Sequence, residues 1–252
     1  MRKLSIVVLT KNEERNIADC LRSLDWADEW IVLDSFSTDR TVEIAKQMGA
    51  QVVQRPFVNY ADQRNAALQL PTHDWIFFVD ADERGTPQLG MEIKQKIQHD
   101  PPVGWWVPRH NYIWGKWIRH AGWYPDYQLR VLLRGKARYD PTREVHEVVI
   151  LDGEAGYLEN PLTHYNYDTV AQFLAKQDRY ADYEARVLYK KGVRPKVHQL
   201  ILQPPREFRR RYITLEGYKD GLHGLLLSLL MGYYTALAYW RLRGIWREKK
   251  LT

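Results

Sequence analysis

The first eighty residues of the chain alternate between short apolar runs and amphipathic segments. The apolar runs predict four strands, at Leu4–Leu9, Trp30–Leu33, Gln51–Gln54 and Trp75–Val79. The segments between them repeat apolar residues every three or four positions and predict three helices, at Asn12–Leu24, Thr38–Met48 and Tyr60–Leu70. Strands that alternate with helices favour an α/β fold with a mainly parallel, Rossmann-like sheet flanked by helices.

The pattern changes near residue 101. Trp, Tyr, Arg and His residues crowd between residues 105 and 124. Beyond them the pattern predicts two strands and a helix, at Tyr127–Leu133, Val145–Leu151 and Thr169–Leu188. Residues 194–205 are interpreted as a linker into a C-terminal tail. We therefore divide the chain into three parts, residues 1–100, 101–195 and 196–252.

Charge is unevenly distributed along the 252 residues, whose net charge is +6. Residues 1–205 hold 27 basic and 27 acidic residues, whereas residues 206–252 hold ten basic and four acidic residues. The tail carries the whole excess, which suggests an anionic partner such as lipid or nucleic acid. Apolar residues make up 45% of the chain, enough for a substantial core. The single cysteine, Cys20, excludes an intrachain disulfide and fits a reducing cytosol.

Polar side chains stand where the predicted strands end. Thr10 follows the first strand, Asp34 the second, and Asp80 and Asp82 the fourth. Ligands of open α/β sheets bind at the carboxyl ends of the strands, so these residues are candidates for a site. Two carboxylates two residues apart on a continuing strand point the same way and can share Mg²⁺ or Mn²⁺. The simpler alternative is a solvated turn in which Asp82 caps a helix.

Four segments carry a family likeness, in this order: "LSIVVLTKNEERNIADCLRSL", "IVLDSFSTDRTVEIA", "YADQRNAAL" and "WIFFVDADE". Together they resemble the inverting glycosyltransferases of family 2, which have the GT-A fold. The resemblance implies a nucleotide-sugar donor, with UDP-glucose favoured, and a divalent metal ion. It makes Asp80-Ala81-Asp82 the DXD motif, in which both aspartates hold the metal ion and Asp80 also approaches the donor. Residues 1–100 would then be the nucleotide-sugar-binding half, and residues 101–195 the acceptor-binding and catalytic half.

The resemblance also implies a set of contacts with the nucleotide, from Thr10, Asn12, Glu13, Asp34 and Arg64. Within that set, Asp34 matches the acid that binds the base, usually uracil. Arg130 is a further candidate, because guanidinium matches phosphate oxygens in bidentate fashion. Each residue has a structural alternative, such as helix capping by Asn12 or an ion pair between Arg64 and a surface acid.

The catalytic base is expected in the stretch "YPDYQLRVLLRGKARYDPTREVHE". It resembles the region where the family carries an acid pair, although here Pro125 replaces the first acid and Asp126 occupies the position of the base. Glu147 and Glu144 are rival candidates. His146 matches the histidine that completes the metal shell in several GT-A enzymes, and its alternative is a core histidine.

The aromatic residues between positions 105 and 124 are either core and lid packing or a platform for a sugar. Sugars stack on Trp and Tyr faces, so the candidates for contact with an acceptor are Trp114, Trp117 and Trp123.

The tail resembles the C-terminal part of bacterial lipopolysaccharide core β-glucosyltransferases. Residues 221–240 lack Lys, Arg, Asp and Glu and approach the ~20 residues that span a bilayer. We expect instead helices that lie in the membrane interface, with Arg209, Arg210 and Arg211 on anionic headgroups and Tyr233 and Trp240 at headgroup depth. A buried helix or an oligomer contact is the alternative.

These features predict a metal-dependent, inverting glycosyltransferase that moves a hexose to a lipid-linked or lipopolysaccharide-core acceptor. The expected location is cytoplasmic, peripheral to the inner face of the bacterial membrane. A nucleotidyltransferase is one alternative, but "LTKNEERN" lacks the glycine of a typical phosphate loop. A nucleic-acid-binding protein that uses the basic tail is another alternative. Such a protein would interleave basic residues with exposed aromatic residues, whereas the basic residues of this tail flank an apolar block. A non-catalytic sugar-binding module is a third.

Overall fold

The computed structural model describes residues 1–141 and 148–248, which form two compact units. The sheet unit consists of Met1–His110 and Asp126–His164, and the helical unit consists of Asn111–Pro125 and Tyr165–Thr252. These two units are defined by compactness. The three parts inferred from the sequence were defined by function, so that division stays a prediction.

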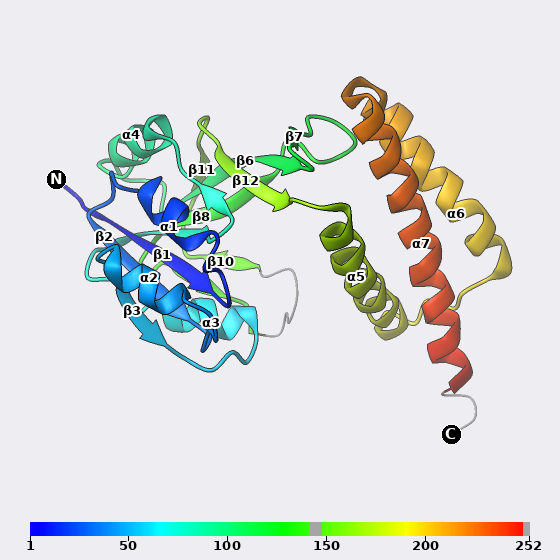
Figure 1. Cartoon of the computed structure of the whole chain (residues 1–252), viewed down its shortest axis with the longest axis horizontal. Coiled ribbons are helices and arrows are strands. Elements are labelled where there is room, and N and C mark those ends of the chain that lie inside the picture. Colours follow the sequence, from blue (N-terminus) through cyan, green and yellow to red (C-terminus); the bar gives the residue numbers. More distant parts are fainter. Residues whose placement is uncertain (142–147, 249–252) are drawn as a thin grey trace. The chain divides into compact units, whose positions relative to one another are not determined.

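The sheet unit is built on a mixed sheet whose first half is parallel (Figure 1). The parallel strands lie in the order β3-β2-β1-β4 and are β1 (Leu4–Thr10), β2 (Glu29–Asp34), β3 (Gln51–Gln54) and β4 (Trp75–Asp80). Next to them, β8 (Tyr127–Leu133) runs antiparallel to β4, and β6 (Gly104–Ile113) runs antiparallel to β8. The α/β fold is confirmed.

The register brings three strand ends to one edge of the sheet. Thr10 of β1 pairs with Asp34 of β2, and Leu9 of β1 pairs with Asp80 of β4. After β4, the two-residue strand β5 (Glu83–Arg84) pairs antiparallel with β12 (Leu162–Tyr167). This pairing sets His164 opposite Glu83, so a histidine from late in the sheet unit lies beside the residues that follow β4.

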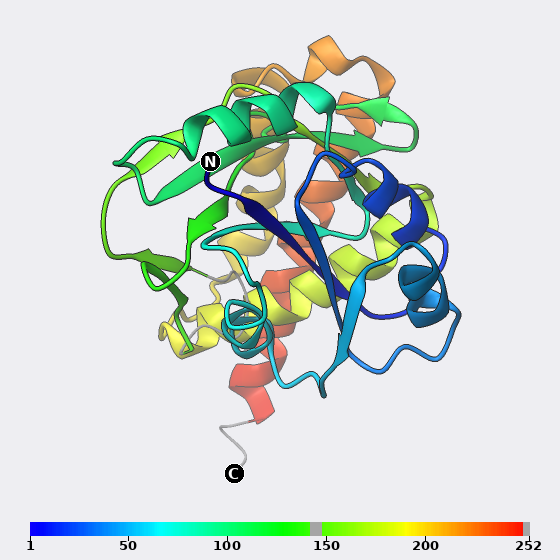
Figure 2. The ribbon, with the colours of Figure 1, turned by 90° about the vertical axis from the view of Figure 1, so that its left-hand side faces the viewer.

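Helices cover both faces of the parallel strands, and α1 and α2 lie side by side in Figure 2. The helices are α1 (Ile17–Arg22), α2 (Thr41–Gln47), α3 (Tyr60–Ala67) and α4 (Pro87–Lys96). The core under α1, α2 and α4 includes Ile6 and Val8 of β1, whereas the core under α3 includes Val7. Alternate residues of β1 therefore point into two apolar cores, which is why the strand reads as a continuous apolar run.

Short strands form the rest of the described sheet unit. They are β9 (Ala137–Tyr139), β10 (Val149–Leu151) and β11 (Ala155–Tyr157). The strand predicted over Val145–Leu151 corresponds to β10, and its first residues lie outside the described part of the chain.

The helical unit contains three long helices and a short hairpin. Its elements are β7 (Lys116–Trp117), α5 (Val170–Lys190), α6 (Val197–Arg209), a π-turn (Arg210–Thr214), a 3₁₀ turn (Gly217–Asp220) and α7 (Leu222–Glu248). Helix α7 packs against both α5 and α6 (Figure 1). Ile113, Phe173 and Leu227 lie in the shared core. Helix α5 begins at a capping box formed by Thr169 and Gln172, as its sequence favours.

Two sequence predictions about secondary structure are wrong. The linker expected over residues 194–205 is largely helix α6, which contains Pro204 and Pro205. Proline weakens a helix, but packing of α6 against α7 stabilises it here, with Gly232 of α7 close to the Pro204 carbonyl. The helix predicted from Asn12 begins only at Ile17, because the preceding residues form a loop bonded to the segment after β2.

Candidate active site

The loops that follow β1 and β2 are joined by side-chain hydrogen bonds. The Asn12 N–H donates to the Ser37 Oγ at 2.8 Å, and the Asn12 Oδ1 accepts from the Thr38 N–H at 2.8 Å. Asn12 has a φ of 57°, in the left-handed region that Asn adopts more readily than most residues. These contacts fix the loop that the sequence predicts to lie along a nucleotide.

Asp34 is fully buried at the end of β2 and connects three strand ends. Its carboxylate accepts from the Thr10 Oγ1 at 3.1 Å, the Gln54 Nε2 at 3.0 Å, and the Ser37 N–H and hydroxyl. Burial disfavours its ionised form, but the hydrogen bonds from Ser37, Gln54 and Thr10 outweigh burial and lower the pKa of Asp34. The geometry makes Asp34 an organiser of the edge of the sheet. Its contact with a base stays a prediction.

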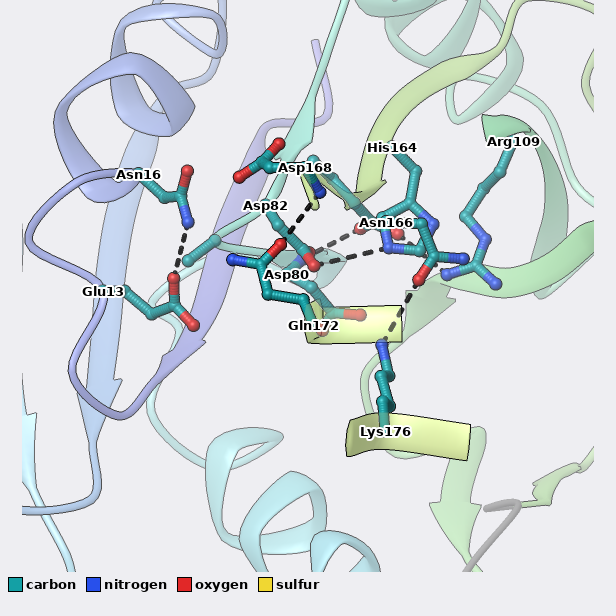
Figure 3. Close-up of polar contacts among 12 residues, drawn as sticks. Glu13, Asn16, Asp80, Asp82, Arg109, His164, Asn166, Asp168, Gln172 and Lys176 are labelled. Carbon is teal, nitrogen blue, oxygen red and sulfur yellow. Dashed lines mark hydrogen bonds and ion pairs between the residues drawn. The ribbon is translucent and has the colours of Figure 1, made fainter. Parts of the chain in front are cut away.

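Glu13 lies among other carboxylates at the same edge. Burial raises the pKa of Glu13, the hydrogen bond that Asn16 donates at 2.8 Å opposes this, and the nearby charges of Asp82, Asp39 and Asp80 raise it further. A concentration of like charge is a place where a bound cation is stabilised. Figure 3 shows Glu13 with Asn16, and Asp80 and Asp82 nearby in the same unit.

Asp80, the last residue of β4, is paired with two arginines. The Arg64 Nη2 lies 3.0 Å from the Asp80 Oδ1, the Arg130 Nη1 donates to the same oxygen at 3.2 Å, and the Arg130 Nη2 contacts the Asp80 Oδ2. Burial opposes ionisation, yet the charges of Arg130 and Arg64 outweigh it and hold the pKa of Asp80 well below its usual range. The predicted donor contacts of Arg64 and Arg130 stay predictions, and both side chains are already anchored by Asp80.

Glu83, the residue that follows Asp82, is fully buried, and the sequence pattern predicted no role for it. Its Oε2 accepts from the Asp80 N–H at 2.9 Å. Its Oε1 lies 3.1 Å from the Arg109 Nη1 and 3.4 Å from the Arg130 Nη2. Glu83 thus fixes the turn after β4 and two cations at once. The signal in the sequence that could have indicated Glu83 is its position directly after Asp80 and Asp82, at the end of an apolar run.

Asp126, the predicted base, is held by Arg109 and Gln128. The Arg109 Nη2 lies 2.7 Å from the Asp126 Oδ2 and its Nε donates to the same oxygen at 3.0 Å, while the Gln128 Nε2 donates to the Oδ1 at 2.8 Å. The Asp126 side chain is 23% exposed. A carboxylate that is both oriented and partly exposed is compatible with a base, and that role stays a prediction.

These contacts form one ion-pair network, which we call the arginine–carboxylate network: Arg64, Arg109, Arg130, Asp80, Glu83 and Asp126. Three guanidinium groups meet three carboxylates in it, so their formal charges cancel. Such cancellation explains how the apolar strand β4 can be followed by the fully buried Glu83, because a buried charge is costly unless it is paired.

Asp82 faces His164 of β12 (Figure 3). The His164 Nε2 lies 3.4 Å from the Asp82 Oδ2, and the His164 side chain is nearly buried. Carboxylate oxygen and imidazole nitrogen are both ligands of Mn²⁺, and Mg²⁺ accepts one or two carboxylates with water and phosphate oxygens. This pair therefore fits a divalent cation whose remaining ligands come from a diphosphate and water. The sequence pattern did not indicate His164, which comes to this place through the pairing of β12 with the segment after β4.

No group of three His, Cys, Asp or Glu side chains that could hold a metal ion occurs among residues 1–141 and 148–248. His146, the histidine predicted from the sequence as a ligand, lies outside the described residues, as do the rival bases Glu144 and Glu147. Asp80 is engaged by two arginines, so Asp82 is the better placed of the two DXD carboxylates for a cation.

The three tryptophans proposed for acceptor contact differ in their surroundings. Trp114 and Trp123 pack against the core of the helical unit, with ring centroids 5.6 and 6.5 Å from Phe173. Trp117 instead lies beneath the Arg119 guanidinium, which is 4.0 Å from its ring centroid. Core packing accounts for the first two, and an acceptor contact stays a prediction for all three.

The residues predicted to meet a membrane also separate into two groups. Arg209, Tyr233 and Trp240 are exposed. Arg210 and Arg211 both pair with Glu207, and the Arg211 Nη1 donates to the Ala121 carbonyl at 2.8 Å. Arg211 therefore supports the helical unit from within.

Comparisons with known proteins bear on the family and the fold. A sequence model described as glycosyl transferase family 2 matches residues 5–160. The lipopolysaccharide core biosynthesis glycosyltransferase LpsC of Rhizobium meliloti (strain 1021) is 29% identical over 241 residues, covering 93% of this chain and 89% of LpsC. The structure of TarS 1-349 from S. aureus covers 95% of this chain and 91% of that chain, with a TM-score of 0.51 and 14% identity, a likeness of fold alone.

A more partial match is the glucosyl-3-phosphoglycerate synthase of Mycobacterium tuberculosis, solved with Mn²⁺, UDP and glucosyl-3-phosphoglycerate. It is 26% identical, with a TM-score of 0.38. The match covers 44% of each chain, less than half of the length of the synthase.

Proposed function

The chain belongs to glycosyl transferase family 2, and we propose that it moves a hexose, with inversion, from a UDP-linked donor to a lipopolysaccharide-core or other lipid-linked acceptor. The reaction takes place at the cytoplasmic face of the bacterial membrane and depends on a divalent metal ion. Likeness to a lipopolysaccharide core biosynthesis glycosyltransferase over most of the chain supports the acceptor class.

One observation carries the proposal: Asp82 and His164 face each other at the carboxyl edge of the sheet, beside the arginine–carboxylate network. Asp82 and His164 would hold the cation together with the donor diphosphate. When bound, a divalent cation stabilises the negative charge that develops on the leaving diphosphate. Arg64 and Arg130 lie on the Asp80 side of this edge and would place guanidinium groups near the same diphosphate.

Asp126 would take the proton of the acceptor hydroxyl while that oxygen attacks the anomeric carbon and the diphosphate leaves. Arg109 and Gln128 orient its carboxylate through hydrogen bonds to both oxygens. A carboxylate accepts a proton only in its ionised form. Attack from the face opposite the leaving group gives a product of inverted anomeric configuration.

Donor hydrolysis by the full chain tests this proposal directly. UDP-, GDP- and ADP-sugars are offered with Mn²⁺, with Mg²⁺ or with EDTA, and turnover is expected for a UDP-sugar with metal only. Binding of UDP is measured separately by calorimetry, with and without Mn²⁺. The product of a UDP-α-hexose on a lipopolysaccharide-core acceptor should show a β linkage by NMR.

His164→Gln should weaken Mn²⁺-dependent UDP binding, whereas the exposed His99→Gln should bind UDP as the unchanged protein does. Removal of a metal ligand weakens binding only when metal is present, so UDP binding in EDTA should be equal for both variants. Full activity in EDTA, or unchanged Mn²⁺-dependent binding in His164→Gln, would contradict the metal assignment.

A further inference from the structure

Helix α7 carries a row of large apolar side chains that no other part of the helical unit covers. The row, which we call the α7 stripe, consists of residues between 41% and 68% exposed: Leu222, Leu226, Leu229, Tyr233 and Trp240. Their spacings of four, three, four and seven residues place them on one side of an α-helix. From first to last they extend about 27 Å along the helix, at 1.5 Å per residue.

The opposite side of α7 is packed along the length of the helix. Leu227, Tyr234 and Ala238 lie in the core of the helical unit, and α5 and α6 flank the helix. By length and composition alone α7 could cross a membrane. A helix packed against two other long helices is unlike a lone spanning segment, because spanning would carry those partner helices into the hydrocarbon as well.

Polar contacts near the C-terminal end of α7 reinforce this conclusion. The Arg241 side chain pairs with Asp178 of α5 at 2.7 Å and with Asp182 at 3.1 Å, and the Trp246 Nε1 donates to the Val193 carbonyl at 2.9 Å. These charged and backbone groups would have to enter the hydrocarbon if α7 spanned a bilayer. The exposed side of α7 alone remains available to lipid.

We propose that the α7 stripe docks the helical unit onto the surface of an anionic lipid bilayer, with α7 lying parallel to the membrane plane. This inference deepens the proposed function, because it names the surface that would bring the enzyme to a lipid-linked acceptor. Leucines occupy the first part of the stripe and aromatic residues the second, and both kinds enter the boundary between headgroups and acyl chains.

The charges around the stripe select anionic lipid. Arg210, Arg211, Lys219 and Arg241 pair with acids of the helical unit, and the first two share Glu207. In contrast, a second set makes no ion pair within the described part of the chain: Arg206, Arg209, Arg243 and Arg247. The first two stand on the last turn of α6, which ends at Arg209, and the last two stand on α7 beyond Trp240. Arg243 and Arg247 stand on the helix that carries the stripe, three and seven residues after Trp240, and as cations without an ion pair they match acidic headgroups.

The same charges disfavour a second copy of the chain as the partner. A twofold interface sets the same patch of each copy against the other. Arg243 and Arg247 lie beside the stripe, so such an interface would bring basic residues close together across an apolar contact. Lipid headgroups supply the opposite charge instead.

Vesicle flotation with the full chain tests the proposal. Phosphatidylcholine vesicles with and without phosphatidylglycerol are compared at low and high salt, and binding should require the anionic lipid and weaken with salt. Leu226→Ser combined with Leu229→Ser should reduce partitioning about tenfold or more, because two exposed leucines lose their apolar contact. The control is Met91→Ser, which removes a side chain that is 65% exposed on α4 of the sheet unit, and it should bind as the unchanged protein does.

Depth and orientation are measured with a fluorophore. A nitrobenzoxadiazole label on Leu229→Cys should shift to the blue and resist an aqueous quencher on vesicles, whereas the same label on Met91→Cys should not change. An alkaline carbonate wash should release the protein, as expected for a helix on the surface. Retention after the wash would show that α7 spans the bilayer, and a dimer by sedimentation that the double Leu→Ser variant dissociates would assign the stripe to a second copy. Either result overturns the proposal.

The test also separates this inference from the proposed function. The double Leu→Ser variant should hydrolyse a UDP-sugar in solution at the rate of the unchanged protein, because α7 contributes no residue to the candidate active site. Normal hydrolysis with no vesicle binding by the unchanged protein would refute the membrane proposal alone. Vesicle binding without hydrolysis of any donor would refute the proposed function alone.

Discussion

Glu83→Gln is the substitution that best tests the arginine–carboxylate network. Glu83 is fully buried and meets the Asp80 N–H and the guanidinium groups of Arg109 and Arg130. Glutamine keeps the shape of glutamate but removes the charge. One glutamate oxygen meets the Asp80 N–H and the other meets two guanidinium groups, so the glutamine amide nitrogen must face a hydrogen-bond donor in either orientation. The network then holds three cations and two carboxylates, so one positive charge is left without compensation in a buried place.

The magnitude follows from the loss of one partner of a buried ion pair. Removing one member typically costs about 3–5 kcal/mol of unfolding free energy, because the remaining charge stays buried and unpaired. At ~2–4 °C per kcal/mol for a chain of this size, the Tm should fall by on the order of 10 °C. Urea unfolding followed by tryptophan fluorescence measures the free energy, and calorimetry measures the Tm.

Glu43→Gln is the matched control, because Glu43 forms an exposed ion pair with Arg40. Exposed pairs contribute little to stability, so this variant should unfold with the unchanged protein. Combining Glu83→Gln with Arg109→Met removes one charge of each sign, and the double variant should lose less than the sum of the single losses. Equal, small losses for Glu83→Gln and Glu43→Gln would show that the buried network does not exist in solution.

Three further predictions concern single side chains. Burial raises the pKa of the Cys20 thiol, so Cys20 should resist iodoacetamide at pH 8 in the folded protein and react after unfolding in urea; fast labelling of the folded protein would contradict its burial. The pKa of Asp34 is lowered in the folded protein, so its ionised form stabilises the fold fully above the ordinary carboxyl pKa of ~4 and less as the pH falls below that value. The free energy of unfolding should therefore drop from about pH 5 to about pH 3, and Asp34→Asn should make this drop smaller. An equally steep drop in Asp34→Asn would rule out this contribution. Asp126→Asn should reduce kcat by ~10²–10⁴ while UDP binding is kept, and an active Asp126→Asn beside an inactive Glu147→Gln would move the role of base to Glu147.

Local pattern was sufficient for the elements that build the edge of the sheet. The strands predicted at Gln51–Gln54 and Tyr127–Leu133 have the observed bounds, and the α/β fold follows from the alternation of strands with helices. The polar residues at the strand ends, Thr10 and Asp34 among them, also come together as predicted. The strands and helices depend on residues close in the sequence, whose apolar period carries the information. Thr10 and Asp34 meet because β1 and β2 pair in parallel, which the alternation of strands and helices favours.

The partners of the carboxylates were decided by tertiary structure. Asp80 meets Arg130 because β8 pairs antiparallel with β4, and Asp82 meets His164 because β12 pairs with the short strand after it. Neither pairing has a signal in the spacing of residues along the chain. The sequence analysis therefore assigned the metal to the two aspartates and His146, whereas the structure sets Asp80 against two arginines.

The tail divides in the same way. The sequence by itself determined that the tail has an apolar segment flanked by basic residues, because charge and hydropathy can be read along the chain residue by residue. The packing of α5 and α6 against α7 decided which side of α7 is left uncovered. Tertiary structure also decided which arginines, such as Arg211 and Arg241, form ion pairs. Packing against α7 also stabilises α6 as a helix although it contains Pro204 and Pro205, where local propensity predicted a linker. A helix face acquires its partner only when distant segments meet. The sequence therefore determined the apolar segment and its basic flanks, and the tertiary structure decided which part of that segment remained exposed.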